Sequence, residues 1–581
     1  MRQTDGLLLL LATGFCAIRA AYPATITVNS TADTISAASC TLRAAITAAN
    51  MNAASGGCLA GDPGPAVDTI AFNIPSSDLG CSATTDVCTI ALTSGLPAMA
   101  DPVAINGYTQ PGSSANTLSV GDNAKLLVEI DATNAGGTVL YFGRHPDSSG
   151  SSLRGLVINH IPGSGISCGF GDCADNLTIA GNFLDTDASG STGSGGGAAI
   201  SLVTDTGATI GGTAPADRNV IARTILLQSC SNTTIQGNYI GLQASGNAAL
   251  QIAGDAINAA NIDHLLIGGG AAGAGNVIGG WTGNAIILAS NNFLQPSISN
   301  NQIKGNLIGT NAAGNAVLLP GQVGIAFGPL TTSSGAGTGN SVGGSAPGEG
   351  NVVAGASEWG ISMQTDETDV VIQGNFVGTD ASGTRALPNA VGIVTLGSSG
   401  TFGGAVAGSG NVVAFNATKG INVASGTNWA IVGNAIYANA GLGISLGGNT
   451  IPTPNDDGDA DTGPNNLQNY PILDTVTIGP VTTVQVSGSL NSGANTTYHV
   501  EFFANANCDA SGNGQGKIFL RSSSIDVTTN PNDVSFGPLA LTVPRDRHVI
   551  TATATDPAGN TSEFSNCALQ DTIFTDSFEG D

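Results

Sequence analysis

The sequence predicts an all-β protein built as a repetitive β-solenoid. One pattern, an apolar pair, a Gly-Asn turn and a second apolar pair, recurs along the chain. Glycine, at 84 of 581 residues, is about twice as frequent as in an average protein, whereas only 10% of residues are charged. Small residues suit tight corners, and Ile, Val and Leu between them suit a narrow core, so we interpret each copy as two short strands joined at a corner. The copies are TIAGNFLDTD (178–187), TIQGNYIGLQ (234–243), QIKGNLIGTN (302–311), VIQGNFVGTD (371–380) and, less regularly, AIVGNAIYAN (430–439).

The N-terminal segment 1–22 is predicted to be a secretory signal peptide. Arg2 is followed by an apolar run from Leu7 to Ala17 and then by small residues, the order typical of such peptides. The run is too short for a membrane helix. We therefore expect a secreted or cell-surface protein, in a compartment that permits disulfides.

Nine cysteines remain after the signal peptide. Because no CxxC pair occurs, disulfides are a better interpretation than a cysteine metal site, and Cys230 is left over. Local spacing predicts three pairs: Cys40 with Cys58, Cys81 with Cys88, and Cys168 with Cys173. A fourth pair, Cys508 with Cys567, would close the last domain.

Residues 39–50, SCTLRAAITAAN, carry a helix signal. Apolar residues at Leu42, Ala45, Ile46 and Ala49 fall on one helical face, and Ser39 or Thr41 can cap the N-terminus. An amphipathic helix at this position is suited to close the end of a solenoid, where unpaired strand edges otherwise aggregate.

The segment CTLRAAI resembles the CSLREA-type motif that opens many secreted bacterial β-helix proteins. DTIAF (68–72), TIALTSGLPAM (89–99) and VAINGYTQPG (103–112) resemble the sequences that follow this motif. The resemblance covers nearly the whole chain and implies a right-handed parallel β-helix with no established activity. Ala44 replaces the usual Glu of the motif, so any role of that acid is lost. We place the N-terminal cap and first coils at 23–150 and the β-helix repeats at 151–450.

The repeats have two periods. Gly-Gly pairs stand far apart, at 211–212, 268–269, 343–344 and 403–404, and Asn-Val steps recur at similar intervals. Apolar anchors stand closer together, at Ile372, Ile393, Val412 and Ile431. We therefore predict three coils of about 20 residues in each repeat of about 60.

Asparagines at the corners are predicted to form a structural ladder. Stacked parallel strands place equivalent side chains in rows, Asn tolerates a positive φ, and stacked Asn amides can hydrogen-bond along a row. A ligand-binding row is the alternative. The predicted members are Asn182, Asn238, Asn306, Asn375 and Asn434.

Residues 451–472 are acidic and rich in Pro and Gly, which predicts a linker. Asp457, Asp459 and Asp461 alternate within it, as at the start of a calcium loop, so calcium is the expected cofactor. The bidentate Glu of an EF-hand would fall at Gln468, so the segment is not an EF-hand, and a solvated acidic linker is the alternative.

The remaining strands alternate with period two and turn signals, which predicts a β-sandwich over 473–569. ATATDPAGNTSEFS at 552–565 resembles the last strands of bacterial immunoglobulin-like modules, so the resemblance implies an immunoglobulin-like sandwich. Residues 570–581 are predicted to be a short C-terminal tail.

The charge pattern limits the partners. The net charge is −26, and the 15 Lys and Arg residues are scattered, so nucleic acid is not an expected partner. Trp281, Trp359 and Trp429 stand near coil corners and could stack on sugars, or fill gaps between coils.

We therefore expect an exported, monomeric β-helix rod that attaches to a cell-surface component or binds extracellular polysaccharide without catalysis. The alternative is a polysaccharide lyase or glycoside hydrolase. That alternative needs paired acids on neighbouring coils, and it depends mainly on analogy with other β-helix proteins.

Overall fold

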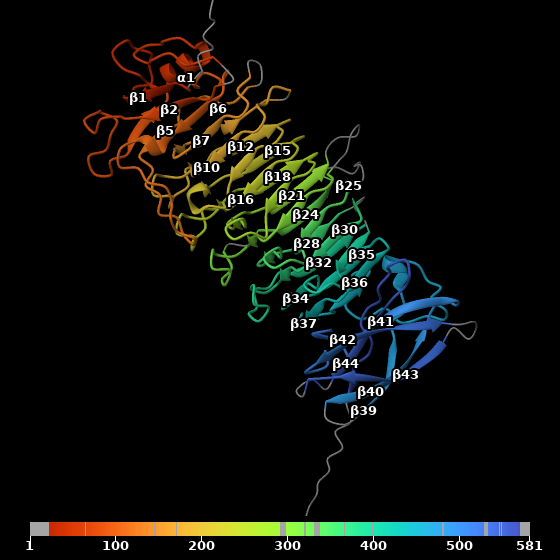
Figure 1. Cartoon of the computed structure of the whole chain (residues 1–581). Helices are drawn as coiled ribbons and strands as arrows, with labels where there is room; N and C mark the ends of the chain where they lie inside the picture. Colours follow the sequence, from red (N-terminus) through yellow and green to blue (C-terminus); the bar gives the residue numbers. More distant parts are fainter. Residues whose placement is uncertain are drawn as a thin grey trace, which may run out of the picture.

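The computed structural model describes residues 23–569, apart from 64–65, 144–146, 170, 291–297, 319–320, 330–336, 365–366, 398, 479–481, 510, 528–532, 545–546 and 548. The predicted signal peptide and tail lie outside the described residues. The described chain is almost entirely β and runs as a long body from α1 at one end to β39 at the other (Figure 1). Its helices are α1 (Leu42–Met51) and three short 3₁₀ segments, η1 (Gly107–Thr109), η2 (Pro215–Asp217) and η3 (Pro464–Leu467).

Three long parallel sheets form the body, the arrangement of a parallel β-solenoid. The first sheet consists of β1 (Thr25–Val28), β2 (Asp68–Phe72), β4 (Val103–Asn106), β7 (Ser152–Arg154), β10 (Thr178–Ala180), β13 (Thr209–Gly211), β16 (Thr234–Gln236), β19 (Leu266–Gly268), β22 (Gln302–Lys304), β26 (Ser341–Gly343), β30 (Val370–Gln373), β33 (Gly400–Gly403) and β36 (Trp429–Val432).

The second sheet consists of β3 (Cys88–Ala91), β5 (Val128–Asp131), β8 (Val157–Asn159), β11 (Phe183–Leu184), β14 (Val220–Ile221), β17 (Tyr239–Ile240), β20 (Val277–Ile278), β23 (Leu307–Ile308), β27 (Val352–Val353), β31 (Phe376–Val377), β34 (Val412–Ala414) and β37 (Ala435–Tyr437).

The third sheet consists of β6 (Thr138–Tyr141), β9 (Ser164–Ser167), β12 (Ala198–Val203), β15 (Ile225–Gln228), β18 (Ile257–Ala260), β21 (Asn284–Ser290), β24 (Val323–Pro329), β28 (Trp359–Met363), β32 (Val391–Leu396), β35 (Ile421–Ser425) and β38 (Ile444–Leu446). A two-stranded ladder pairs β25 (Gly337–Thr338) with β29 (Glu367–Thr368) beside the body.

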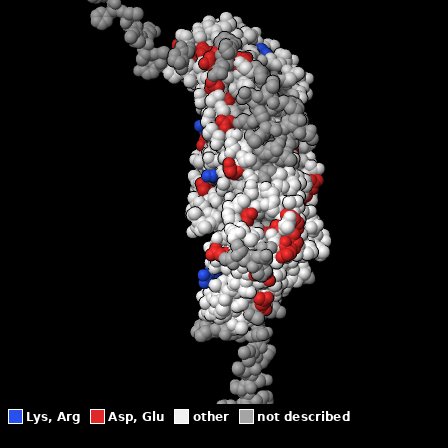
Figure 2. All heavy atoms as spheres, turned by 90° about the vertical axis from the view of Figure 1, so that its right-hand side faces the viewer, with Lys and Arg blue, Asp and Glu red and all other residues white. Residues whose placement is uncertain are grey.

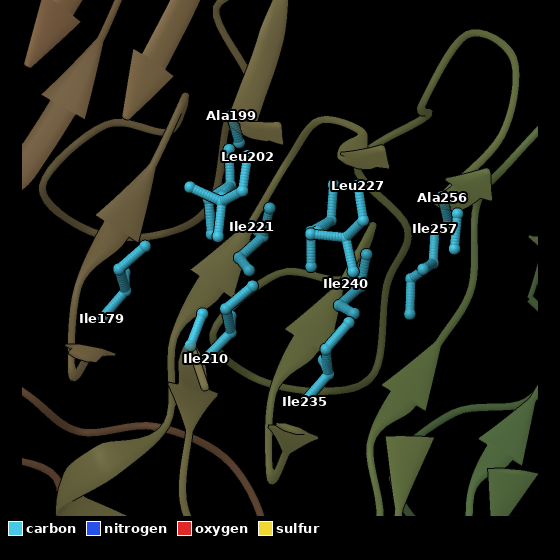
Figure 3. Close-up of a cluster of buried hydrophobic side chains, with 14 of the residues drawn as sticks. Ile179, Ala199, Leu202, Ile210, Ile221, Leu227, Ile235, Ile240, Ala256 and Ile257 are labelled. Atoms are coloured by element: carbon cyan, nitrogen blue, oxygen red, sulfur yellow. The ribbon is translucent and has the colours of Figure 1, made fainter. Parts of the chain in front are cut away.

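Aliphatic side chains from the three sheets stack in rows inside the solenoid. Ile179 pairs with Ile210, and Ile210 with Ile235, so equivalent residues of successive coils lie over one another. Ile221 and Ile240 form a second such row (Figure 3). All five side chains are fully buried. The register is therefore set by residue-for-residue stacking, because a one-residue slip would turn each strand's apolar side chains outward.

The predicted coil length is wrong. Ile372 lies in the first sheet, Ile393 in the third, Val412 in the second and Ile431 in the first again. The spacing of these four anchors is therefore the distance along the chain between strands of different sheets, and not the length of one coil. Each coil contributes one strand to each sheet, and Phe402 pairs with both Ile372 and Ile431, so the segment from Ile372 to Ile431 spans two coils.

The predicted corner asparagines lie in one buried row together with four others. Asn238 shows the pattern: its Nδ2 donates to the Ile210 carbonyl (2.9 Å) in the preceding coil and to Asn276 Oδ1 (3.0 Å) in the next. The Asn238 backbone N–H also donates to Asn276 Oδ1 (3.0 Å). The row runs Asn182, Asn219, Asn238, Asn276, Asn306, Asn351, Asn375, Asn411, Asn434.

The N-terminal helix begins as the sequence predicts. Thr41 is the N-cap, and its hydroxyl accepts a hydrogen bond from the Ala44 N–H (3.2 Å). Arg43 forms an ion pair with Asp33 (2.9 Å), and Leu42 is buried in the same core as Ile26. The CTLRAAI motif thus supplies a cap, a core residue and an ion pair that fixes the helix to the preceding loop.

Two antiparallel sheets follow the solenoid. The three-stranded sheet contains β39 (Ile472–Ile478), β40 (Thr483–Asn491) and β43 (Asp533–Thr542). The four-stranded sheet contains β42 (Ile518–Val527), β41 (Thr496–Asn505), β44 (Val549–Thr555) and β45 (Ala568–Leu569). Alternate residues of β40 are buried, as the period-two pattern predicts. We call these two sheets, with their connecting loops, the C-terminal module.

The four predicted disulfides are present: Cys40–Cys58, Cys81–Cys88, Cys168–Cys173 and Cys508–Cys567. Cys230 is a free thiol in the solenoid core.

The C-terminal module and the segment before it cover the last coil. Ile436 in β37 exchanges both backbone hydrogen bonds with Gly516 (2.8 and 2.6 Å). Asn465 Oδ1 accepts from the Trp429 N–H (3.0 Å), and Asn465 is fully buried. Residues 451–472 are therefore not a solvated linker, because part of this segment pairs with the edge of β36.

Candidate functional site

The acidic segment forms a loop that gathers three carboxylates. Ligand atoms of Asp456, Asp459 and Asp461 lie within 4.8 Å of one another, and in the described residues this is the one such group of at least three acidic, His or Cys side chains. The alternating acidic residues of the sequence predict that Asp457, and not Asp456, is the third carboxylate of this group. The prediction is wrong for Asp457, whose exposed side chain accepts a hydrogen bond from Asn491 Nδ2 (3.3 Å).

Asp459 is held between the loop and the C-terminal module. Its Oδ1 accepts from the Asn469 N–H (3.0 Å), and its Oδ2 accepts from Gln468 Nε2 (2.6 Å) and from the Ser492 hydroxyl. Burial raises the pKa of Asp459 to about 6 despite these donors. Burial and the neighbouring Asp456 carboxylate also raise the pKa of Asp461. A cation would relieve both the burial cost and the repulsion.

The three tryptophans do not form one surface. Trp281 and Trp429 are buried, at 1% and 0% exposure, so the predicted sugar-stacking role is wrong for these two. Trp429 stacks on Phe402 inside the first sheet (4.6 Å between ring centroids), and its Nε1 donates to the Gly397 carbonyl (3.1 Å). Trp359 is half-buried on the third sheet and packs against an apolar cluster that includes Ile287. The tryptophans are separated because they belong to different rows of the solenoid.

Charged side chains on the coils form pairs. His160 Nδ1 lies 3.1 Å from Asp131 Oδ1, and Arg154 lies 3.4 Å from Asp217. His264 Nδ1 lies 2.7 Å from Asp263 on the exposed surface. Arg154 and Asp217 form a partly exposed ion pair, and each histidine lies beside one carboxylate; surface contacts of this kind contribute little to stability and do not define a catalytic arrangement by themselves.

A groove of about 410 Å³ crosses the second sheet near the N-terminal end. Its two carboxylates are occupied by donors: Glu129 accepts from Thr89 Oγ1 and Asn159 Nδ2 (both 2.6 Å). Asp187 accepts from the Ser189 hydroxyl and from two backbone N–H groups. Burial raises the pKa of Asp187, but the hydrogen bonds outweigh it and hold this pKa below its usual value. A glycosidase needs one carboxyl group with a raised pKa as the acid, and Asp187 does not have this property.

The junction between the last coil and the C-terminal module contains a buried carboxylate that no sequence pattern indicates. Glu563 is almost fully buried, and its two carboxylate oxygens accept from the Leu446 N–H (2.9 Å) and the Thr453 N–H (2.6 Å). Burial raises the pKa of Glu563 to about 7. Nothing in the local sequence around Glu563 indicates that it pairs with Leu446, a residue of a much earlier strand.

The surface charge is mostly negative. Figure 2 shows Asp and Glu side chains spread along one face of the body and only a few Lys and Arg side chains among them. Within the described residues, no helix is both long and apolar enough to cross a bilayer. No protein-family model matches the chain, and no curated protein sequence matches it significantly.

Proposed function

We propose that this protein is an exported, non-catalytic rod that binds glycans or attaches to a cell-surface component. The observation that carries the proposal is the continuous row of nine buried asparagines, which holds successive coils in register. A solenoid fixed in this way is a stiff scaffold with a repetitive outer surface, as glycan-binding and attachment proteins use. Export and CSLREA membership are parts of this proposal, supported by the motif and the four disulfides. A monomeric state is a further part of the proposal.

The two ends of the rod have distinct roles in this proposal. Helix α1 acts as the N-terminal cap, because its buried face packs beside β1 and β2. The C-terminal module is an immunoglobulin-like sandwich that covers the other end. Closed ends suit an isolated rod in an extracellular medium, where open strand edges would pair with other chains.

Glycan binding is tested with a glycan array followed by analysis of the bound glycan. The proposal expects binding with no change in the glycan. New reducing ends or unsaturated products from pectin, alginate or chondroitin would instead establish the lyase or hydrolase alternative. The absence of binding to any glycan or bacterial surface would contradict the proposal.

We also propose that the acidic loop binds calcium through Asp456, Asp459 and Asp461. Asp461 Oδ1 is shielded from solvent and accepts no hydrogen bond from the described residues, so it is an available ligand. Carboxylate oxygens are the ligands that calcium prefers. Isothermal titration with Ca²⁺ should show binding that Asp461→Asn abolishes. Asp457→Asn is the matched control, because Asp457 is a neighbouring acid outside the group, and equal loss in both variants would contradict the site.

A further inference from the structure

Two adjacent hollows lie where the last coil meets the C-terminal module. One, of about 300 Å³, is lined on the solenoid side by Tyr437 and Asn439 and on the module side by Asp509, Lys517 and Arg547, among others. The other, of about 320 Å³, is lined by Ser382, Thr384, Phe415, Tyr437 and Lys517, among others. Because both share Tyr437 and Lys517, we treat them as one feature, the junction groove. Ligand sites occur preferentially at such boundaries between modules.

Contacts between the solenoid and the C-terminal module fix the walls of the junction groove. Gly516 pairs with Ile436, which places Lys517 opposite Tyr437. Gln515 Nε2 donates to the Asn439 carbonyl (2.9 Å) and to Asp509 Oδ2 (2.8 Å), and this second bond occupies an acidic side chain of the groove. The Cys508–Cys567 disulfide closes the loop that carries these residues. The groove is therefore held in shape without a ligand.

Lys517 lies against an aromatic ring and not against a carboxylate. Its Nζ lies 4.4 Å from the centre of the Tyr437 ring, and it forms no ion pair with a carboxylate of the described residues. Arg43, Arg223 and Lys304 have carboxylate partners, whereas Arg218, like Lys517, lies over a tyrosine ring (4.4 Å to the Tyr239 centroid). In a chain with 41 acidic and 15 basic residues, an ammonium group in a groove without such a partner is available to an anionic ligand.

Two aromatic rings stand beside Lys517. Phe415 meets Tyr437 edge to face, with ring centroids 5.6 Å apart, and both side chains are half-buried. Phe415 has φ +61°, a conformation that is costly for a bulky residue and that concentrates at ligand sites. The Tyr437 hydroxyl is fixed by donation to the Gly383 carbonyl. The two rings thus form a rigid apolar part of the groove lining next to Lys517.

Hydroxyl groups complete the groove. Ser382 and Thr384 are exposed, and the nearby Asp380 carboxylate accepts from the Ser382 hydroxyl (2.7 Å) and from the Thr384 N–H (3.3 Å). Asp380 is thus occupied by neighbouring donors, as Asp509 is by Gln515. Because the Ser382 hydroxyl donates to Asp380, its oxygen accepts from the Thr384 hydroxyl (2.6 Å), and the Thr384 oxygen keeps acceptor capacity for a ligand hydroxyl.

We propose that the junction groove binds an acidic oligosaccharide, in which Lys517 pairs with a ring carboxylate. Phe415 and Tyr437 pack against the sugar, and Ser382 and Thr384 hydrogen-bond its hydroxyl groups. This inference rests on the proposed glycan-binding function and names its site and ligand class. The net charge of −26 disfavours an anionic ligand for the chain as a whole, but the local groups at the groove, and not the sum over the chain, face the ligand.

The test is titration of the full mature chain with oligogalacturonate, oligoalginate, a chondroitin sulfate oligosaccharide and a neutral cello-oligosaccharide. We expect the acidic sugars to bind and the neutral sugar to bind at least tenfold more weakly. Lys517→Gln should weaken binding of the acidic sugar about tenfold, the value of one charge-assisted hydrogen bond. Higher salt should reduce the wild-type affinity and have less effect on the variant.

Two further variants keep the test decisive. Lys304→Gln removes a cation that is paired with Glu349 on the solenoid and should leave affinity unchanged. Thr384→Ala alters an exposed groove residue, carries little risk of misfolding and should weaken binding about threefold, the effect of one hydroxyl hydrogen bond. Equal affinity of wild type, Lys517→Gln and Thr384→Ala for a bound glycan would overturn the inference and leave the proposed function intact. Binding of no glycan by the wild type would overturn both.

Discussion

The solenoid and the C-terminal module bury different kinds of groups. The solenoid buries a row of nine asparagine side chains, each at 3% exposure or less, between its aliphatic rows. The C-terminal module has a core of alternating apolar residues such as Val484, Val486 and Leu490. An asparagine of this row, such as Asn238, needs hydrogen-bond partners in the coils before and after it. A coil therefore depends on its neighbours, whereas the module pairs its strands within itself.

The last coil shows how this dependence ends, in a second and shorter row of buried asparagines, Asn389, Asn416 and Asn439. Asn439 donates to Gln515 Oε1 through its backbone N–H (3.1 Å) and its Nδ2 (3.2 Å), and Asn416 donates to Asn439 Oδ1 in the same way. Gln515 thus takes the position that the next asparagine would occupy. The module acts as a substitute coil, which explains why two unlike architectures fit together.

Removing the C-terminal module should have the largest effect, because it should make the chain self-associate. A chain ending at residue 449 exposes the edges of β36, β37 and β38 and loses the donors and acceptors that satisfy them. We expect this chain to self-associate, as measured by size-exclusion chromatography with light scattering. If the shortened chain stays as monodisperse as the full mature chain, the module is not needed as a substitute coil.

Breaking the asparagine row within the solenoid should have the next largest effect, a loss of folding stability. Asn306→Ala removes Oδ1, which accepts from the backbone N–H and the Nδ2 of Asn276. It also removes Nδ2, which donates to Asn351 Oδ1 and to the Ile267 carbonyl. Unpaired buried groups of this kind should lower the free energy of unfolding by about 4 kcal/mol, as measured by chemical denaturation. Asn315→Ala, at an exposed asparagine of the same coil, is the control and should change stability little.

The junction should respond to pH through Glu563. Burial raises the pKa of Glu563 to about 7 in the folded chain, above its ordinary value of 4.5. Its protonation therefore stabilises the fold fully below about pH 4.5, and this contribution is lost as the pH rises through 7. The expected loss is about 3 kcal/mol between pH 4.5 and 8.

Glu563→Gln tests this titration directly. The variant cannot ionise, so the stability of the wild type relative to the variant should fall as the pH rises from 5 to 8. Comparison with the variant is needed because burial also raises the pKa of Asp205 to about 7, and Asp205 titrates in both chains. A stability difference that is independent of pH would show that the Glu563 carboxyl titrates in its ordinary range.

The smallest expected effect is the difference in stabilisation between a disulfide of the module and a disulfide of the solenoid. Cys508–Cys567 in the module spans 59 residues, whereas Cys168–Cys173 in the solenoid spans 5. In the chain-entropy account, the longer loop stabilises by about 2 kcal/mol more. Unfolding of the two paired Cys→Ser variants by denaturant measures this difference. Equal losses would mean that native packing, and not loop entropy, sets the contribution of each bridge.

Much of the architecture could be predicted because its signals are local. Thr41 and the apolar face that begins at Leu42 predict α1, and the Gly-Asn corners predict the buried row that includes Asn238. The coil length was not predicted correctly, because the spacing of apolar anchors counts strands without saying which sheet each one joins. The prediction that Trp281 and Trp429 are exposed is wrong for a related reason. Whether a residue at a corner points into the core or toward solvent depends on how the neighbouring coil packs against it.

The candidate sites were the least predictable part. Alternation in the sequence groups Asp457 with Asp459 and Asp461, but the loop turns Asp457 toward Asn491 and brings Asp456 into the group. The roles of Lys517 and Glu563 depend on contacts with residues far away in the chain, and no local pattern marks them.

The sequence by itself determined the repeating β architecture, the helix near the N-terminus and the three local disulfide pairs, because corner residues, period-two strands and short cysteine spacings act over short stretches of chain. Only the tertiary structure decided the number of strands per coil, the closure of the last coil and the groups that meet in the acidic loop and the junction groove. These depend on which side chains of distant segments lie over one another, and stacking, not sequence distance, brings them together.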